Sequence, residues 1–323
     1  MRVGLVLCRQ GSPDVSTQEP LLECVLNVSE GTDAAVLAAL AAEAGAALLD
    51  LHSDSSHNRC VLTLAGDASE VQASARRVAR CAVETLDLAR HSGVHPRIGV
   101  LDVVPWVSLE LAALPGQSSR DSKLPPLKRD RVSPWRVRDG APDKALAARE
   151  SFAVWAAESL SLPCFTYGPE RQLPEVRRQA WKTLSPDYGP PIPHPTAGAA
   201  AVGARPLLVA YNLWLDSASA EVAQRLAKSL RGPYVRALGL SVAGGAQVSC
   251  NLLAPAVVSP AAVFDTVAAS AALARAELVG LAPAFVLDAI ERSRWAELGL
   301  SPDHTIEAGL ARRGWPDPVP QHS

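Results

Sequence analysis

Hydrophobic and polar positions alternate in two ways along this chain, and their order predicts a mixed α+β fold. Short apolar runs rich in Val and Leu, typical of strands, are interleaved with alanine-rich segments whose apolar residues recur every three or four positions, as in helices. In the first half we predict a strand at 22–28, a helix at 32–46, strands at 47–53 and 60–65, a helix at 68–90 and a strand at 98–106. That order, β-α-β-β-α-β, is the split βαβ pattern.

The second half of the chain repeats this order. We predict a strand at 206–215, a helix at 218–230, strands at 235–242 and 247–253, a helix at 259–275, a short strand near 277–280 and a last helix at about 284–298. The sequence therefore predicts an α+β protein of two ferredoxin-like βαββαβ subdomains, which are α/β sandwiches packed together. A cleft where the two units meet would be a natural place for a site.

Two segments lie outside the repeated order. Residues 1–20 carry little periodicity, so we expect an N-terminal extension before a first subdomain at 21–203, a second at 204–312 and a tail at 313–323. Within the first unit, about 114–143 is rich in Pro, Ser and basic residues. Its basic residues after position 122 are Lys123, Lys128, Arg129, Arg131, Arg136 and Arg138. We favour a disordered surface insertion, and the alternative is a basic lid anchored by Trp135 over a polyanionic substrate.

Composition limits the possible functions. The chain is 48% hydrophobic and 20% charged with a net charge of −2, so neither a nucleic-acid footprint nor an acidic tail is indicated. No apolar run approaches the length of a membrane span. The six cysteines are scattered and form no CxxC pair, which favours reduced thiols in a cytoplasmic protein. Because the histidines form no HExxH pair, we expect no metal site.

The segment from His91 to Asp102 carries the strongest chemical signal. It reads HSGVHPRIGVLD and lies between a predicted helix and a predicted strand, where loops commonly display catalytic side chains. His95 could accept and return a proton near neutrality, Arg97 could hold a carboxylate, and Asp102 could orient an imidazole. The alternative reading for His91 is a helix C-cap with Gly93 as the stop, and we favour it there.

Several ordered segments resemble the glutamate formimidoyltransferase, or formiminotransferase, family. Residues 95–103 read HPRIGVLDV and resemble that family's HPRMGALDV, and residues 23–31 read ECVLNVSEG against ECVPNFSEG. Residues 48–59 resemble the family's LLDVD…STNR, residues 187–212 its PDFGP…GAR…AFN, and residues 247–253 its AQVSTNLL. The likeness covers about Leu22 to Leu310, and ordered motifs are far more specific than one motif alone.

The resemblance implies a one-carbon transferase of histidine metabolism. Such an enzyme moves a formimino group from N-formimidoyl-glutamate to N5 of its co-substrate tetrahydrofolate. It further implies His95 as the general base, with Asp102 and Asp50 as further catalytic candidates. For substrate binding it implies Arg97, Asn58, Arg59, Gly189, Pro190 and Gly198. Asn58 and Arg59 read equally well as a polar turn between strands. Family members are often dimers, so we expect a cytoplasmic homodimer, and no cyclodeaminase domain.

Two departures from the family pattern bear on the acceptor. His52 stands where the family has an aspartate, so an imidazole replaces a permanent negative charge. The family's folate-binding loop GPSSFVPSWG is here GPPIPHPTAG at 189–198, which lacks the aromatic residues on which a flat pterin would stack. Two alternatives therefore stay open: a diverged transferase that uses another acceptor or donor, and a non-catalytic folate- or ligand-binding protein. His52 in the cleft would favour the diverged transferase.

Overall fold

The computed structural model describes residues 21–113, 135–242 and 245–315. The first β-α-β-β-α-β unit forms as predicted: its four strands lie in the order β2-β3-β1-β4, and every neighbouring pair is antiparallel. Its elements are β1 (Leu21–Val28), α1 (Ala34–Ala44), β2 (Leu48–Asp54), β3 (Arg59–Asp67), α2 (Ala68–Thr85) and β4 (Leu101–Ala113). This is the strand order of a ferredoxin-like unit.

Three further strands extend this first sheet beyond the predicted unit. β7 (Ala200–Ala204) runs parallel to β4, β6 (Cys164–Tyr167) runs parallel to β7, and β5 (Trp135–Asp139) pairs antiparallel with the far end of β4. The connecting helices are α3 (Pro142–Leu160) and α4 (Leu173–Gln179). None of these three added strands was predicted from the sequence.

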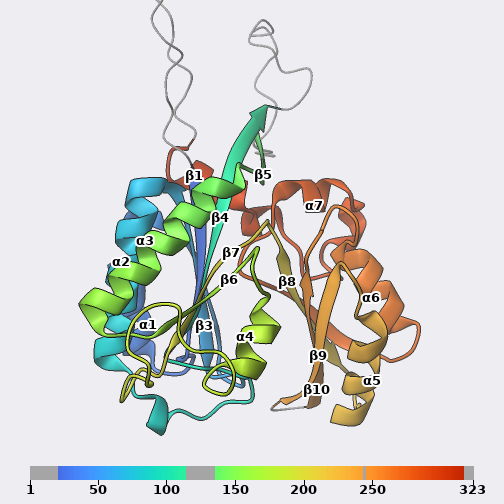
Figure 1. Cartoon of the computed structure of the whole chain (residues 1–323). Helices are drawn as coiled ribbons and strands as arrows, with labels where there is room; N and C mark the ends of the chain where they lie inside the picture. The colour runs from blue at the N-terminus through green and yellow to red at the C-terminus, as the bar shows by residue number, and fades with distance from the viewer. Residues whose placement is uncertain (1–20, 114–134, 243–244, 316–323) are drawn as a thin grey trace, which may run out of the picture.

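The second unit repeats the first in a separate four-stranded sheet of order β11-β8-β10-β9, again antiparallel throughout. Its elements are β8 (Val209–Leu215), α5 (Ala220–Leu230), β9 (Val235–Val242), β10 (Gly245–Leu252), α6 (Pro260–Ala268) and β11 (Leu273–Val279). α7 (Ala284–Asp288) and α8 (Ile306–Arg312) follow. The expectation of an α+β fold with two ferredoxin-like units is thus confirmed (Figure 1).

Several predicted boundaries are wrong. The helix predicted at 68–90 ends at Thr85, and the helix predicted at 259–275 ends at Ala268. Residues 273–275 belong instead to β11, which includes most of the short strand predicted near 277–280 and begins earlier, because pairing with β8 outweighs the helix propensity of the alanines. The helix predicted at 284–298 shortens to α7 followed by a 3₁₀ turn at Arg292–Arg294.

The basic insertion is only partly described. Residues 114–134, which include Lys123, lie outside the described residues. The predicted disorder is wrong for 135–143, which form β5, a two-residue link and the first two residues of α3. Backbone pairing with β4 holds this strand, and its arginines form ion pairs: Arg136 with Asp288 at 2.5 Å and Arg138 with Glu110 at 3.0 Å.

Strand alternation gives each sheet one covered face and one open face. Along β1, Cys24, Leu26 and Val28 are fully buried in the core beneath the helices α1, α2 and α3, whereas Glu23 and Asn27 point to the opposite face. In the second unit α5 and α6 cover the outer face in the same way (Figure 1). The two uncovered faces are therefore turned toward each other.

The C-terminal segment joins the two sheets at one end. Leu281, Ile306 and Leu310 pack with Leu21 and Val107 of the first sheet in a separate buried cluster. The buried Glu307 carboxylate of α8 also accepts hydrogen bonds from the amides of Val137 at 2.7 Å and Ala284 at 2.8 Å. The rest of the space between the open faces is left as a cleft.

Gly239 of β9 provides a test of this packing. A Cβ atom at this position would overlap the backbone of Gln224 and Ala223 in α5. We expect Gly239→Ala to lower the free energy of unfolding by about 1–3 kcal/mol, because backbone atoms cannot move aside as a side chain can. Gly232→Ala is the matched control, since its Cβ would meet no atom within 4 Å. Urea unfolding of both variants would refute the packing argument if their stabilities were equal.

Candidate active site

A cleft of about 740 Å³ lies between the open faces of the two sheets. β1, β2 and β3 line one side of it, and β8, β9 and β10 line the other. A volume of this size is typical of small-molecule sites. Six arginines line the cleft: Arg59, Arg177, Arg178, Arg205, Arg231 and Arg236.

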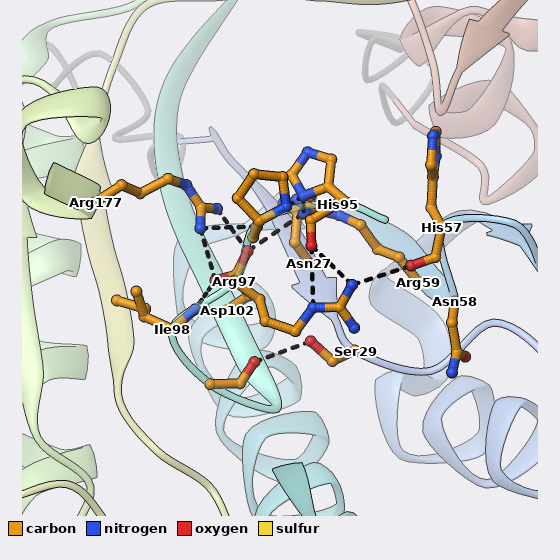
Figure 2. A network of polar contacts seen from close by, with 12 residues as sticks. Asn27, Ser29, His57, Asn58, Arg59, His95, Arg97, Ile98, Asp102 and Arg177 are labelled. Carbon is orange, nitrogen blue, oxygen red and sulfur yellow. Dashed lines mark hydrogen bonds and ion pairs between the residues drawn. The ribbon is translucent and has the colours of Figure 1, made fainter. Parts of the chain in front are cut away.

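The turn that carries His95 is fixed by the backbone around it. The Ile98 amide donates to Asp102 Oδ1 at 2.8 Å, and the amide of Ala199 donates to the Ile98 carbonyl at 3.0 Å. Gly99 lies directly against the backbone of Ala199, where any Cβ would clash. The Ser29 hydroxyl donates to the Gly99 carbonyl at 2.9 Å (Figure 2). His95 is thereby displayed from a braced segment into the cleft.

The His95 ring makes two competing contacts through Nδ1. Arg59 Nη1 lies 2.7 Å from Nδ1, and the Pro96 carbonyl oxygen lies 2.8 Å from the same atom (Figure 2). Burial, followed by the positive charges of Arg59 and Arg177, lowers the pKa of His95 to about 2. In the free protein His95 is therefore a neutral imidazole.

The Asp102 carboxylate is the hub of the surrounding charges. It is 1% exposed, and it accepts from Arg177 Nη2 at 2.6 Å and from Arg59 Nη1 at 3.2 Å. Arg59 also donates to the Asn27 side chain at 3.1 Å through Nε. We expected Asp102 to orient the imidazole directly. Instead it holds the two guanidinium groups, and Arg59 in turn contacts His95 (Figure 2).

Arg97 and Asn58 brace the site from behind and are not among the residues that line the cleft. Arg97 Nη2 donates to the carbonyl oxygens of His95 at 2.7 Å and His57 at 3.3 Å. Asn58 accepts from the Gly31 amide and donates to the Ser92 carbonyl, both at 2.9 Å. With φ at +44°, Asn58 occupies the left-handed region in the turn between β2 and β3. Their substrate-binding roles stay predictions.

The predicted catalytic Asp50 is not among the cleft-lining residues, although it pairs directly with Thr63 and shares the face of β2 that carries His52. Burial raises the pKa of Asp50, and the charges that lower it come from His52, His304 and Arg312, which places this carboxyl toward α8. His52, by contrast, lines the cleft, with Nε2 3.9 Å from Glu277 Oε1. His57 also lines it, and its ring lies 6.0 Å from the His95 ring.

The loop at 189–198 supports the His95 turn. Gly198, at φ +71°, packs on the carbonyl of Ile98, and a backbone bridge joins it to Gly99. Gly189, Pro190 and Gly198 are absent from the cleft lining, within the part of the chain that the structure describes. Their predicted substrate contacts remain untested.

The sequence reading missed Arg177, Asn27 and Glu23 as site residues. Arg177 comes from α4, where a pair of arginines on a short helix looks like any solvated surface. Asn27 and Glu23 lie within the ECVLNVSEG segment, and strand alternation could have placed both on one face of β1. Alternation alone does not tell which face is open.

The described residues contain no group of three or more His, Cys, Asp or Glu side chains arranged to hold a metal ion. Cys24, Cys60, Cys81, Cys164 and Cys250 are free thiols. Within the same described ranges, no helix has the length and apolar character needed to cross a membrane.

Similar proteins agree with this fold and cleft. Residues 21–118 match the family described as the formiminotransferase domain, N-terminal subdomain. Over 298 residues the chain is 33% identical to a glutamate formimidoyltransferase of Streptococcus pyogenes serotype M1, covering 83% of this chain and 90% of that protein. A glutamate formimidoyltransferase of Thermoplasma acidophilum is 28% identical over 263 residues, covering 72% of this chain and 76% of that protein.

A longer relative is matched over part of its length. The formimidoyltransferase-cyclodeaminase of Sus scrofa is 31% identical over 300 residues, which is 81% of this chain but 50% of that protein, and the cyclodeaminase part is not covered. The extent and identity of these matches show that the chain is a transferase enzyme and belongs to the glutamate formimidoyltransferase, or formiminotransferase, family.

Proposed function

We propose that this protein transfers the formimino group of N-formimidoyl-glutamate to tetrahydrofolate, with His95 as the general base. The observation that carries the proposal is a neutral imidazole displayed into a cleft beside the guanidinium groups of Arg59 and Arg177. The names of the relatives support formimidoyl transfer. The acceptor and the role of His95 are our own inferences.

The arginines of the cleft suit the carboxylates of both substrates. Guanidinium groups bind carboxylates through paired, charge-assisted hydrogen bonds. Burial lowers the pKa of Arg59 to about 10, so this side chain stays charged at neutral pH. Arg59 and Arg177 share the single carboxylate of Asp102, which leaves donor capacity for a substrate.

His95 can serve both proton transfers of the reaction. The acceptor amine must lose a proton as it attacks the formimino carbon, and the leaving glutamate nitrogen must gain one. His95 Nε2 can take the first proton and return it to the second nitrogen. This requires the tautomer in which Nδ1–H donates to the Pro96 carbonyl and Nε2 carries the lone pair.

Arg59 opposes that tautomer in the free protein. A guanidinium only donates, so its bond to Nδ1 places the imidazole proton on Nε2. A substrate carboxylate that draws Arg59 away would free Nδ1 to bond Pro96. The same carboxylate would offset the positive charge around the ring and raise the pKa of His95 toward the useful range. The donor would thus help to activate its own base.

The cleft residues fit tetrahydrofolate in charge and size. This co-substrate would supply the secondary amine N5 as nucleophile and a glutamate carboxylate for the arginines. The loop at 189–198, which lacks the family's aromatic residues, is not part of the cleft lining. Its altered sequence therefore does not remove a stacking surface from this cleft. Positioning both substrates beside His95 would supply much of the rate gain.

His52 supports a second candidate function, transfer with a different acceptor or donor. Its side chain lines the cleft where the family has an aspartate, so the residue change falls where a substrate would contact it. A diverged transferase of this kind would keep His95 as the base. We further infer a cytoplasmic homodimer in histidine-derived one-carbon metabolism, as the family resemblance implies.

His95→Gln tests the general base. We expect turnover to fall by about 10²- to 10⁴-fold, because the amide cannot accept the proton. The melting temperature should change little, since the His95 side chain is only partly buried. His304→Gln, at an exposed histidine of a 3₁₀ turn, is the control for loss of an imidazole alone. Transfer assays that find His95→Gln as active as wild type would exclude His95 as the base.

Arg177→Gln tests the electrostatic control of that base. Removing a neighbouring cation favours the imidazolium, so the pKa of His95 should rise from its depressed value. Because the base must be unprotonated, the acid limb of the kcat/KM profile should move to higher pH. Arg90→Gln, at an exposed arginine, should leave the limb in place. A profile for Arg177→Gln that overlays the wild-type profile would contradict this account.

A further inference from the structure

The cleft contains a buried carboxyl that the proposed chemistry does not use. Glu23 of β1 lines the cleft, yet its side chain is buried to 3% exposure. Its carboxylate forms no hydrogen bond or ion pair within 4 Å to a described residue. Buried carboxylates in folded proteins are normally paired, so an unpaired one that faces a cleft calls for a ligand.

The groups around Glu23 do not neutralise it fully. Burial raises the pKa of Glu23 to about 7, Arg205 lowers it, and the carboxyls of Asp139 in β5 and Glu307 in α8 raise it further. Asp139 already accepts from the Leu207 amide, and Glu307 from two amides. Arg205 donates to the Pro206 carbonyl. Of these three carboxyls, Glu23 alone accepts no hydrogen bond from a described residue.

A second unpaired polar atom lies beside Glu23. Thr63 is 1% exposed and lines the cleft, and its hydroxyl has no hydrogen-bond partner among the described residues. In the register of β1 and β3, Glu23 pairs with Ala65 and Val25 pairs with Thr63, so Glu23 and Thr63 are diagonal neighbours on one face. The two groups together offer three oxygen atoms to one ligand.

The separation between Glu23 and the His95 end of the cleft can be estimated along β1. Asn27 lies four residues along the same strand and bonds to Arg59, which contacts His95. A strand rises about 3.3 Å per residue, so the α-carbons of the two residues are about 13 Å apart. Arg59 and Arg177 lie at the His95 end, and Glu23 lies at the other, where Arg205 is close enough to lower its pKa. A substrate with an anionic part and a nitrogen-rich part would match both.

We propose that Glu23, assisted by Thr63, binds the amidine-like edge of a substrate, where two N–H groups on one carbon face the two carboxylate oxygens. The inference rests on the proposed function, which supplies such an edge in the aminopyrimidinone ring of tetrahydrofolate. The formimino group of the donor must react beside His95, so it is not available to Glu23 at the other end of the cleft. Paired hydrogen bonds from an N–C–N unit to an ionised carboxylate are strong and directional.

The test compares Glu23→Gln with wild type by calorimetry under reducing, anaerobic conditions. Tetrahydrofolate carries the edge, and p-aminobenzoyl-L-glutamate is a fragment of it that lacks the pterin and with it the edge. N-formimidoyl-L-glutamate and L-glutamate test whether binding of the donor depends on Glu23. We expect the variant to bind tetrahydrofolate about tenfold or more weakly and the other three probes unchanged, because Gln keeps one acceptor and adds a repelling donor. Glu43→Gln, at an exposed carboxylate, is the control.

Two further readouts separate recognition from a structural role. Wild-type affinity for the affected ligand should rise with pH through about 7 as Glu23 ionises, and the variant should lose this dependence. A carboxyl with a raised pKa stabilises the fold below its ordinary pKa of 4.5 and loses that contribution as pH rises through about 7. Glu23→Gln, which resembles the protonated form, should therefore melt no lower than wild type at pH 8.

The outcomes are distinct. Unchanged affinity for tetrahydrofolate, or an equal loss of affinity for p-aminobenzoyl-L-glutamate, would overturn the inference and leave ordered water as the occupant. If wild type transfers the formimino group while Glu23→Gln binds normally, the proposed function stands and only this subsite fails. A wild-type protein that binds neither tetrahydrofolate nor N-formimidoyl-L-glutamate would overturn both.

Discussion

The buried carboxylate of Asp102 is the constraint on which the site depends. An ionised group that is 1% exposed must be matched by charge and hydrogen bonds, and here Arg59, Arg177 and the Ile98 amide match it. These partners come from β3, from α4 and from the turn before β4. One carboxylate therefore fixes three separate parts of the first unit around His95. The same arrangement concentrates positive charge at one end of the cleft.

The open faces of the sheets turn this local network into a bipolar binding site. Period-two alternation places the polar residues of β1 and β3 on the face without helices, and the second sheet closes over them. The guanidinium groups of Arg59 and Arg177 lie near His95, and the unpaired carboxyl of Glu23 lies toward the end that α8 covers. A substrate would thus be oriented by its charges before chemistry begins. Orientation of this kind is the main source of rate in a transfer between two bound molecules.

The repeated βαββαβ unit could be predicted from sequence patterns, but the strands that extend the first sheet could not. The strands of both βαββαβ units carry long alternating or apolar runs, so their existence could be read directly. β6 and β7 are short and consist largely of small or mixed residues, and they form because β4 offers a free edge. The predicted helix that corresponds to α6 was too long, because the alanines that follow it are compatible with helix or strand and pair with β8 as a strand. Secondary-structure propensity is a weak guide where tertiary contacts determine whether a segment forms a helix or a strand.

The residues of the candidate site likewise divide into those that the sequence predicted and those that it did not. His95, Arg59 and Asp102 were found from the motif, and the structure brings them together. Asp50 and the loop at 189–198 share the motif's sequence signal, but Asp50 is outside the cleft lining near α8, and the loop lies against the His95 turn. Arg177 gave no signal, because a long-range contact between α4 and β4 carries its role. A motif identifies a neighbourhood, and the side-chain directions within it depend on the fold.

The position of α8 has a consequence for how this duplicated chain behaves as a whole. The last helix of the second unit buries Ile306 and Leu310 against the first sheet, and Glu307 caps backbone groups of both units. If the two units were separated, each would therefore expose hydrophobic residues that are now buried between them. The two halves, although they are repeats in topology, should unfold in one cooperative transition, and the width of the cleft is set by the same contacts that hold the fold.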